Sequence, residues 1–166
     1  ASIRLRALWA LHAMGLAKPA TLLDDPNEHL RTWAVRLLTD AWPIDSLFGP
    51  RPNRLPKGNP KLEKKFVQLA KSDPSSLVRL ALASTLQRLP VSSRGKLAQA
   101  LAGRVEDGQD HNLPMLVWYG ITPLAESDPE ALVGVARATE WTSLRQWIAR
   151  SLTDQAKERP EGLQAL

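Results

Sequence analysis

A short motif recurs along the chain and constrains its fold more than any other feature. Residues 25–31 and 73–79 both read Asp-Pro, then three residues, an aliphatic residue and Arg. Weaker copies end at Arg6, Arg145 and Pro114, where Pro replaces the Arg. Apolar residues follow every copy four and seven positions later, which is the spacing of one helix face. The sequence therefore predicts a helical unit that repeats along the chain.

Helical periodicity extends over nearly the whole sequence, and alternating β-branched runs are scarce, so we predict an all-α fold. Asp25, Asp73, Asp128 and Asn59 each precede a Pro, which predicts four N-caps, and Ser92 is a further candidate cap. Pro123 should end or kink its helix because it lacks a backbone donor. The predicted helices span residues 2–16, 19–24, 27–41, 60–72, 75–89, 93–105, 113–125, 129–139 and 143–158.

The Asp-Pro…aliphatic-Arg pattern resembles the HEAT repeat, a pair of antiparallel helices that stacks into a superhelix. The resemblance implies an α-α superhelix, a HEAT/armadillo-like solenoid of about four to five helix pairs, over residues 1–166 as a single domain. Both ends lie in helical pattern, so we expect a fragment of a longer protein. The resemblance also implies ladder residues that join adjacent repeats, namely Asp25, Asp73, Arg6, Arg31, Arg79 and Arg145.

A second, narrower resemblance comes from two stretches, DHNLPMLVWYG at 110–120 and LRTWAVRL at 30–37. Both resemble the large bacterial membrane-bound dehydrogenases of the PVC-type haem-binding family. In that family a sorbosone-dehydrogenase-like β-propeller precedes a HEAT-like region and a c-type haem domain. The resemblance implies a linker domain of an exported or periplasmic protein. The chain has no Cys, hence no Cys-x-x-Cys-His, so we expect no cofactor on this domain.

The positive charge is concentrated in one segment. The chain has a net charge of +5, and residues 51–65 account for all of it. We expect the prolines in the insertion at 49–60 to hold it extended, and the predicted helix that follows carries three lysines on one face. This basic patch could dock an acidic protein surface, a neighbouring domain, anionic lipid or nucleic acid, or it could be a solvated insertion. Its members are Arg51, Arg54, Lys57, Lys61, Lys64 and Lys65.

Six of the nine aromatic residues are tryptophans. Trp9, Trp33 and Trp147 follow a repeat Arg by two or three positions, and Trp118 lies in the matching copy. Recurrence at one register favours packing between helices over ligand stacking, because large aromatic rings mostly serve buried area. Trp42 and Trp141 lie at helix ends, outside that register. We expect Trp141 to show a face to solvent and count it with the partner-binding candidates.

Catalytic and metal-binding patterns are weak. His111 lies between Asp110 and Asn112, which could bind a metal or transfer protons, but a capping loop explains the same residues and no other His has ligand spacing. The carboxylate pairs Asp24-Asp25 and Glu106-Asp107 could serve a hydrolase, but both fall at turns, where acids cap helices. No phosphate loop or nucleophile motif is present. We therefore predict no catalytic residue and no metal site.

These observations predict a non-catalytic scaffold or interaction domain that links parts of a larger, dehydrogenase-like protein. Its expected partner is protein, either neighbouring domains of the parent chain or an acidic partner. The alternative is a HEAT-like nucleic-acid binder or DNA glycosylase, which the chain resembles in repeat type and Trp content. Charges outside residues 51–65 cancel, which argues against a basic nucleic-acid surface. The apolar stretches are also too short to span a bilayer.

Overall fold

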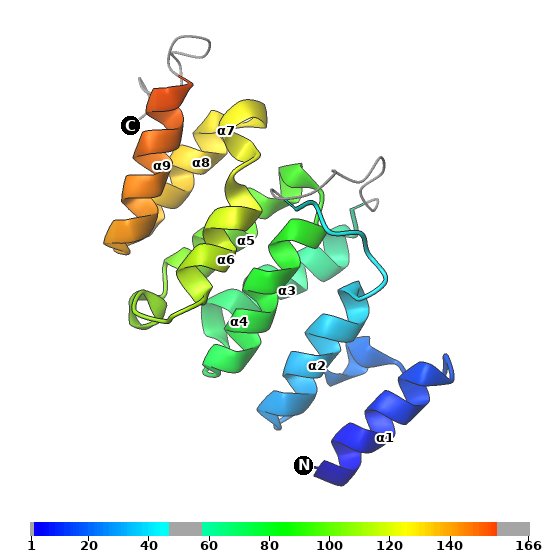
Figure 1. The fold of residues 1–166 in the computed structure, drawn as a ribbon. Coiled ribbons are helices and arrows are strands. Elements are labelled where there is room, and N and C mark those ends of the chain that lie inside the picture. The colour runs from blue at the N-terminus through cyan, green and yellow to red at the C-terminus, as the bar shows by residue number, and fades with distance from the viewer. Residues whose placement is uncertain (1, 47–57, 156–166) are drawn as a thin grey trace.

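A computed structural model describes residues 2–46 and 58–155 of the chain, and it contains no strand over those residues (Figure 1). The prediction of an all-α domain is therefore confirmed. Within these two ranges three short 3₁₀ turns connect helices, η1 (Pro19–Leu22), η2 (Leu86–Arg88) and η3 (Val105–Asp107). The helices are α1 (Ser2–Ala13), α2 (Glu28–Thr39), α3 (Pro60–Ser72), α4 (Ser76–Thr85), α5 (Val91–Ala102), α6 (Leu113–Ile121), α7 (Leu124–Ser127), α8 (Pro129–Ala138) and α9 (Thr142–Asp154).

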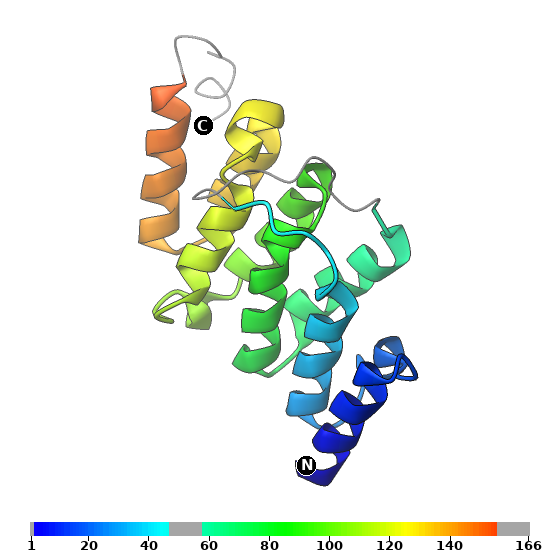
Figure 2. The same cartoon turned by 45° about the vertical axis from the view of Figure 1, so that its right-hand side comes forward.

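The helices form two layers. One layer contains α1, α2, α4, α6 and α9, each packed against the next (Figures 1 and 2). In the other layer α3 contacts α5 and α5 contacts α8, while the turn η1 packs against α2. Each helix of the second layer also contacts its chain neighbour in the first, as in α3 with α4, α5 with α6, and α8 with α9. Consecutive helix pairs thus lie side by side.

A continuous apolar core lies between the two layers. It runs from Leu23 to Leu152 and includes Phe66, Leu82 and Leu101, all of which are buried. Each helix from α2 to α9 contributes to it, because each has an apolar face that it cannot cover alone. Burial of this shared surface is the main term that stabilises the domain.

Prolines place several helix boundaries as predicted. Asn59 and Asp128 are N-caps whose side chains accept hydrogen bonds from the Leu62 and Ala131 N–H groups. Helix α6 ends at Ile121, two residues before Pro123, and the single turn α7 follows that proline. The predicted stretch at 19–24 is the 3₁₀ turn η1, and the predicted helix at 143–158 is described only to residue 155.

Three of the predicted caps are wrong. Asp25 and Asp73 lie two residues before the true N-caps, Asn27 and Ser75, and each carboxylate accepts the N–H of its cap residue. An Asp carboxylate readily bonds the backbone two residues on, so Asp-Pro forms the turn that precedes the helix. Ser92 lies inside α5, whose N-cap is Pro90.

After α2, residues 40–46 cross over the end of the helix layer (Figure 2). The Asp45 N–H donates to the carbonyl of Gln87, and the Asp45 side chain accepts from Arg94 at 2.9 Å. Arg88 donates to the carbonyls of Asp40 and Trp42. These contacts fix the segment against η2 and α5. Within the described residues no helix is both long and apolar enough to cross a bilayer.

Candidate functional site

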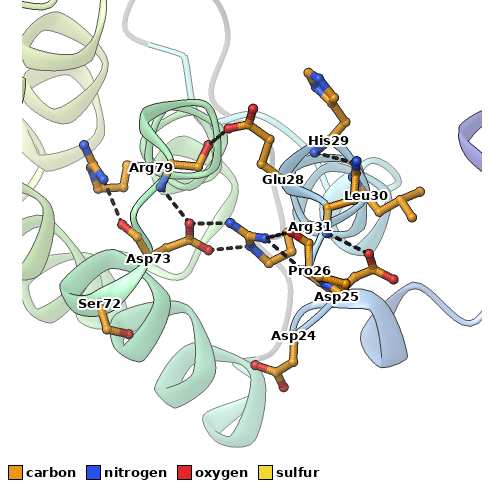
Figure 3. A network of polar contacts seen from close by, with 12 residues as sticks. Asp24, Asp25, Pro26, Glu28, His29, Leu30, Arg31, Ser72, Asp73 and Arg79 are labelled. Atoms are coloured by element: carbon orange, nitrogen blue, oxygen red, sulfur yellow. Dashed lines mark hydrogen bonds and ion pairs between the residues drawn. The ribbon is translucent and has the colours of Figure 1, made fainter. Parts of the chain in front are cut away.

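Arg31 forms a polar bridge between two neighbouring helix pairs. Its Nε lies 2.7 Å from Asp73 Oδ2 and its Nη2 lies 2.8 Å from Asp73 Oδ1, a bidentate pairing. Its Nη1 donates to the Asp25 carbonyl at 2.8 Å, at the turn that opens its own helix (Figure 3). Ser75 adds a second link between the same pairs, because its hydroxyl donates to Glu28 at 2.5 Å. Arg31 therefore ties α2 to the turn before α4.

Arg79 repeats this geometry one helix pair further along. It pairs with Asp107 through Nε and Nη2, with 2.6 Å between Nη2 and Oδ1, and its Nη1 donates to the Asp73 carbonyl at 2.8 Å. Both side chains are almost fully buried. Arg4 and Asp25 form a third pair, with Arg4 largely exposed. Together these three contacts, called the Arg–Asp bridges below, connect four successive units of the chain.

The bridges shift the pKa values of their members. Burial alone would raise the pKa of Asp73, but hydrogen bonds from Arg31 and the Ser75 N–H, with the Arg31 charge, outweigh burial and lower it. Hydrogen bonds from the Asn27 N–H and from Arg4 lower the pKa of Asp25. Hydrogen bonds to the carboxylates of Asp73 and Asp107 raise the pKa of Arg31 and Arg79 respectively. All four groups are therefore charged at neutral pH.

The bridges include Arg31, Arg79, Asp25 and Asp73 from the predicted ladder but differ from it at other positions. Arg6 is exposed, and Arg4 pairs with Asp25 instead. Arg145 donates to the Ala136 carbonyl within its own helix pair and forms no ion pair with the described residues. The ladder predicted from the Asp-Pro motif did not include Asp107, because Gly108 and not Pro follows it. Its place at an inter-helix turn was the only available hint.

The basic patch is only partly placed by the structure. Arg51, Arg54 and Lys57 lie outside the described residues. Lys61 and Lys64 are exposed on α3, whereas Lys65 is half-buried. The Lys65 Nζ lies 2.5 Å from Asp24 Oδ1. Lys61 and Lys65 line a depression of about 450 Å³ between η1, α2 and α3.

Trp141 is buried, so the expectation that it faces solvent is wrong. Only 3% of its surface is exposed, and its Nε1–H donates to the Arg104 carbonyl at 3.0 Å. The ring packs on Gly108 so closely that a Cβ there would lie 2.5 Å from Cδ1. A ring with an apolar body and one donor fits a buried site that offers one carbonyl. Trp141 is therefore removed from the partner-binding candidates.

Two tryptophan pairs join neighbouring helices of the first layer. Trp9 of α1 meets Trp33 of α2 edge to face, with ring centroids 4.8 Å apart. Trp118 of α6 and Trp147 of α9 lie 6.2 Å apart. Trp118 and Trp147 pack against the core, whereas Trp9 keeps 40% of its surface exposed. The shared register thus places all four rings between helices of one layer.

A groove lies over α4, between α2 and α6, with a volume of about 550 Å³. Most of its lining is apolar, and Leu77 and Met115 are exposed by 41% and 43%. Sequence reasoning missed it because its residues come from three helices. They are Thr32 and Arg36 of α2, then Leu77, Leu80, Ala81 and Ser84 of α4, with Asn112, Met115, Leu116 and Tyr119 of the α6 segment.

The acid pairs and His111 lie at turns between helices. Asp25 and Asp107 belong to the bridges, Asp24 pairs with Lys65, and Glu106 pairs with Arg104 at 2.7 Å. The Asp110 carboxylate accepts the N–H groups of Asn112 and Leu113, each at 2.8 Å, and His111 is exposed. Within residues 2–46 and 58–155, no three His, Asp or Glu side chains converge as metal ligands would.

Comparison with known proteins gave no match to a family model, a curated protein or a solved structure.

Proposed function

We propose that this chain is a HEAT-like repeat module, an α-α superhelix that acts as a non-catalytic scaffold or interaction domain. The observation that carries the proposal is the series of Arg–Asp bridges. Arg4, Arg31 and Arg79 each reach the Asp at the turn that precedes the next helix of the first layer, so the same polar contact recurs from one unit to the next. Recurring contacts between neighbours are the hallmark of repeat arrays, whose units stabilise one another in sequence.

The Arg–Asp bridges favour a rigid arrangement of the helix pairs, as a scaffold domain requires. A bidentate Arg–carboxylate contact sets the relative orientation of two units as well as their distance. Because Arg79 and Asp107 are nearly fully buried, water does not weaken the contact between them. The carboxylates that a hydrolase could have used are the ones engaged with arginine or lysine. We propose further, on the resemblance to PVC-type haem-binding dehydrogenases, that the module links parts of a larger exported protein.

The proposal is tested by assaying the purified chain for turnover. Substrates for hydrolases, DNA glycosylases and oxidoreductases are each incubated with the wild type and with Asp24→Asn/Glu106→Gln, which alters one acid of each pair outside the bridges. We expect no turnover above that of a boiled sample. Turnover by the wild type that this variant abolishes would show that the chain is an enzyme, and the scaffold proposal would fall.

Nucleic-acid binding is the competing function, and a DNA titration separates it from the proposal. Contacts with phosphates would make affinity fall steeply with salt. Of the three described lysines of the patch, Lys65 already pairs with Asp24, so we expect weak binding without sequence preference. Tight binding with a steep salt dependence, lost on charge reversal at Lys61, Lys64 and Lys65, would favour the nucleic-acid binder instead.

A further inference from the structure

The groove over α4 lies where α4 carries small side chains at the position at which α2 and α9 carry tryptophan. Trp33 and Trp147 follow Arg31 and Arg145 by two residues, and the residue at that position after Arg79 is Ala81. Ala81 and Ser84 line the groove. The two tryptophan pairs fill the spaces between α1 and α2 and between α6 and α9, and α4 contributes to neither pair. The groove lies between these two tryptophan pairs, over α4.

The groove has the chemistry of a protein-binding surface. Leu77 and Met115 expose apolar side chains beside the half-buried Leu80 and Leu116, which together make an apolar surface rimmed by Thr, Ser and Asn. Exposed apolar surface with a polar rim is typical of sites that bind other proteins. Methionine adds an adaptable contact, because its side chain is flexible and polarisable.

Among the described residues that line the groove, Arg36 is the one that carries a charge. It lies over the Trp33 ring, 4.5 Å from its centroid, and forms no hydrogen bond or ion pair with the described residues. Stacking on the ring restrains the guanidinium and leaves its N–H donors available. A carboxylate is the partner that this group binds best. A segment that fills the groove should therefore carry an acid at the α2 side.

We propose that the groove over α4 binds an amphipathic protein helix that inserts apolar residues between α2 and α6 and pairs a carboxylate with Arg36. This inference rests on the proposed function and names its partner class. Helices α2 and α6 lie on either side of α4, so a segment that lies along α4 meets side chains of all three helices. Helices commonly dock in such grooves through apolar anchors on one face.

Nucleic acid and lipid surfaces fit the groove less well. Phosphate groups would need several cations, whereas the described lining of the groove has one, Arg36, beside Leu77, Met115 and other uncharged side chains. A membrane surface would need a convex apolar or basic face, whereas this surface is hollowed.

The test uses two matched sets of short helical peptides with the same apolar residues at i, i+3, i+4 and i+7. One set has Glu at the flanking positions and the other has Lys. Binding to the full chain is measured by fluorescence anisotropy. We expect the acidic set to bind about tenfold tighter or more, because only its carboxylates can pair with Arg36. Arg36→Glu should reverse that preference.

Variants within and outside the groove locate the site. Leu77→Glu/Met115→Glu should weaken binding of the acidic set about tenfold or more, because it places two acids on the apolar surface. Val105→Glu is the matched control, since Val105 is an exposed apolar residue, 55% exposed, in η3 outside the groove. It should bind as the wild type does. Circular dichroism and the urea midpoint check that each variant folds.

Four outcomes would overturn the proposal. In the first, neither peptide set binds, and in the second, both sets bind equally well. In the third, Val105→Glu weakens binding as much as Leu77→Glu/Met115→Glu does. In the fourth, single-stranded DNA binds more tightly than the acidic peptides. These results differ from failure of the proposed function, which is judged by turnover. If the chain neither turns over substrate nor binds the acidic peptides, the scaffold proposal stands and the proposal of a helix-binding groove falls.

Discussion

Arginines of this chain lie in very different surroundings, and their expected contributions differ accordingly. Arg94 is fully buried and donates to the carbonyls of Leu89 and Gly120 as well as to Asp45. Arg79 is 3% exposed, whereas Arg4 is 58% exposed. A buried charge that loses its partner has no water to replace it, so the loss destabilises far more than at the surface.

We expect Asp107→Ala to destabilise the chain by about 3–5 kcal/mol, because it leaves the guanidinium of Arg79 buried without its carboxylate. Urea unfolding followed by circular dichroism measures the change. Arg4→Ala, at the exposed end of the same series, is the control and should cost about 1 kcal/mol or less. Equal losses in the two variants would contradict the assignment of Arg79–Asp107 as a buried bridge.

Acid should weaken the fold through the bridge carboxylates. The pKa values of Asp25 and Asp73 are lower in the folded chain than in the unfolded chain. Their ionised forms therefore stabilise the folded state above the ordinary Asp pKa of about 3.9, and this stability is lost as pH falls through the folded values. We expect the free energy of unfolding to decline below about pH 4, as measured by urea titrations from neutral to acid pH.

Asp73→Asn provides the control for that pH dependence. The variant cannot ionise at position 73, so it should be less stable than the wild type at neutral pH. It should also lose less stability on acidification, because one of the linked protonations is gone. Parallel stability curves for the wild type and the variant would show that Asp73 is not a source of the acid sensitivity.

Two helical glycines, Gly120 and Gly134, lie close to a side chain of a neighbouring element. In α6, a Cβ at Gly120 would lie 2.3 Å from the Leu86 Cβ, so α6 and η2 can pack this closely only without a side chain there. In α8, a Cβ at Gly134 would meet only the end of the Gln99 side chain, at 2.5 Å. Leu86 is buried in the core, whereas the Gln99 amide can move aside.

The two glycines therefore respond differently to the same substitution. We expect Gly120→Ala to destabilise the chain by about 1–3 kcal/mol, because overpacking forces α6 away from η2. Gly134→Ala should be neutral or stabilising by up to about 1 kcal/mol, since alanine favours the helix. Thermal unfolding of the two variants compares them directly. A stable Gly120→Ala variant would mean that α6 and η2 have room to separate.

Over the whole molecule, one core and one crossing segment hold the layers together. The core continues from α2 to α9, so no helix pair in that range folds around an interior of its own. The crossing segment at residues 40–46 reaches from α2 to η2 and α5, which are distant in the sequence. Its anchor is Asp45, which is 4% exposed and pairs with the fully buried Arg94.

We expect Asp45→Ala to destabilise the whole chain by about 3–5 kcal/mol, because it leaves Arg94 buried without its carboxylate. Amide hydrogen exchange should also show lost protection at residue 45, whose N–H bonds the Gln87 carbonyl. Asp40→Ala is the control, since Asp40 is exposed and contributes its backbone carbonyl to Arg88. If both variants behave alike, the Asp45–Arg94 pair is not the anchor.

The sequence by itself determined the local structure of this protein. Apolar periodicity predicted the helices and Pro123 predicted the break after α6, because both act through the backbone of neighbouring residues. The recurring motif also identified Arg31, Arg79, Asp25 and Asp73 as special positions. The charge distribution of the sequence predicted the basic patch, and the structure describes only Lys61, Lys64 and Lys65 of it.

Only the tertiary structure decided which distant residues meet. Asp107 had no motif to mark its pairing with Arg79, and nothing local distinguished Arg94, which is fully buried, from an exposed helical arginine. The position of Trp141 at a helix end predicted exposure to solvent, but in the fold its ring packs against the turn at Gly108. The one sign of the groove in the sequence is Ala81, which follows Arg79 at the position where Trp33 follows Arg31. Helix formation depends on near neighbours, whereas burial and pairing depend on which helix faces pack together.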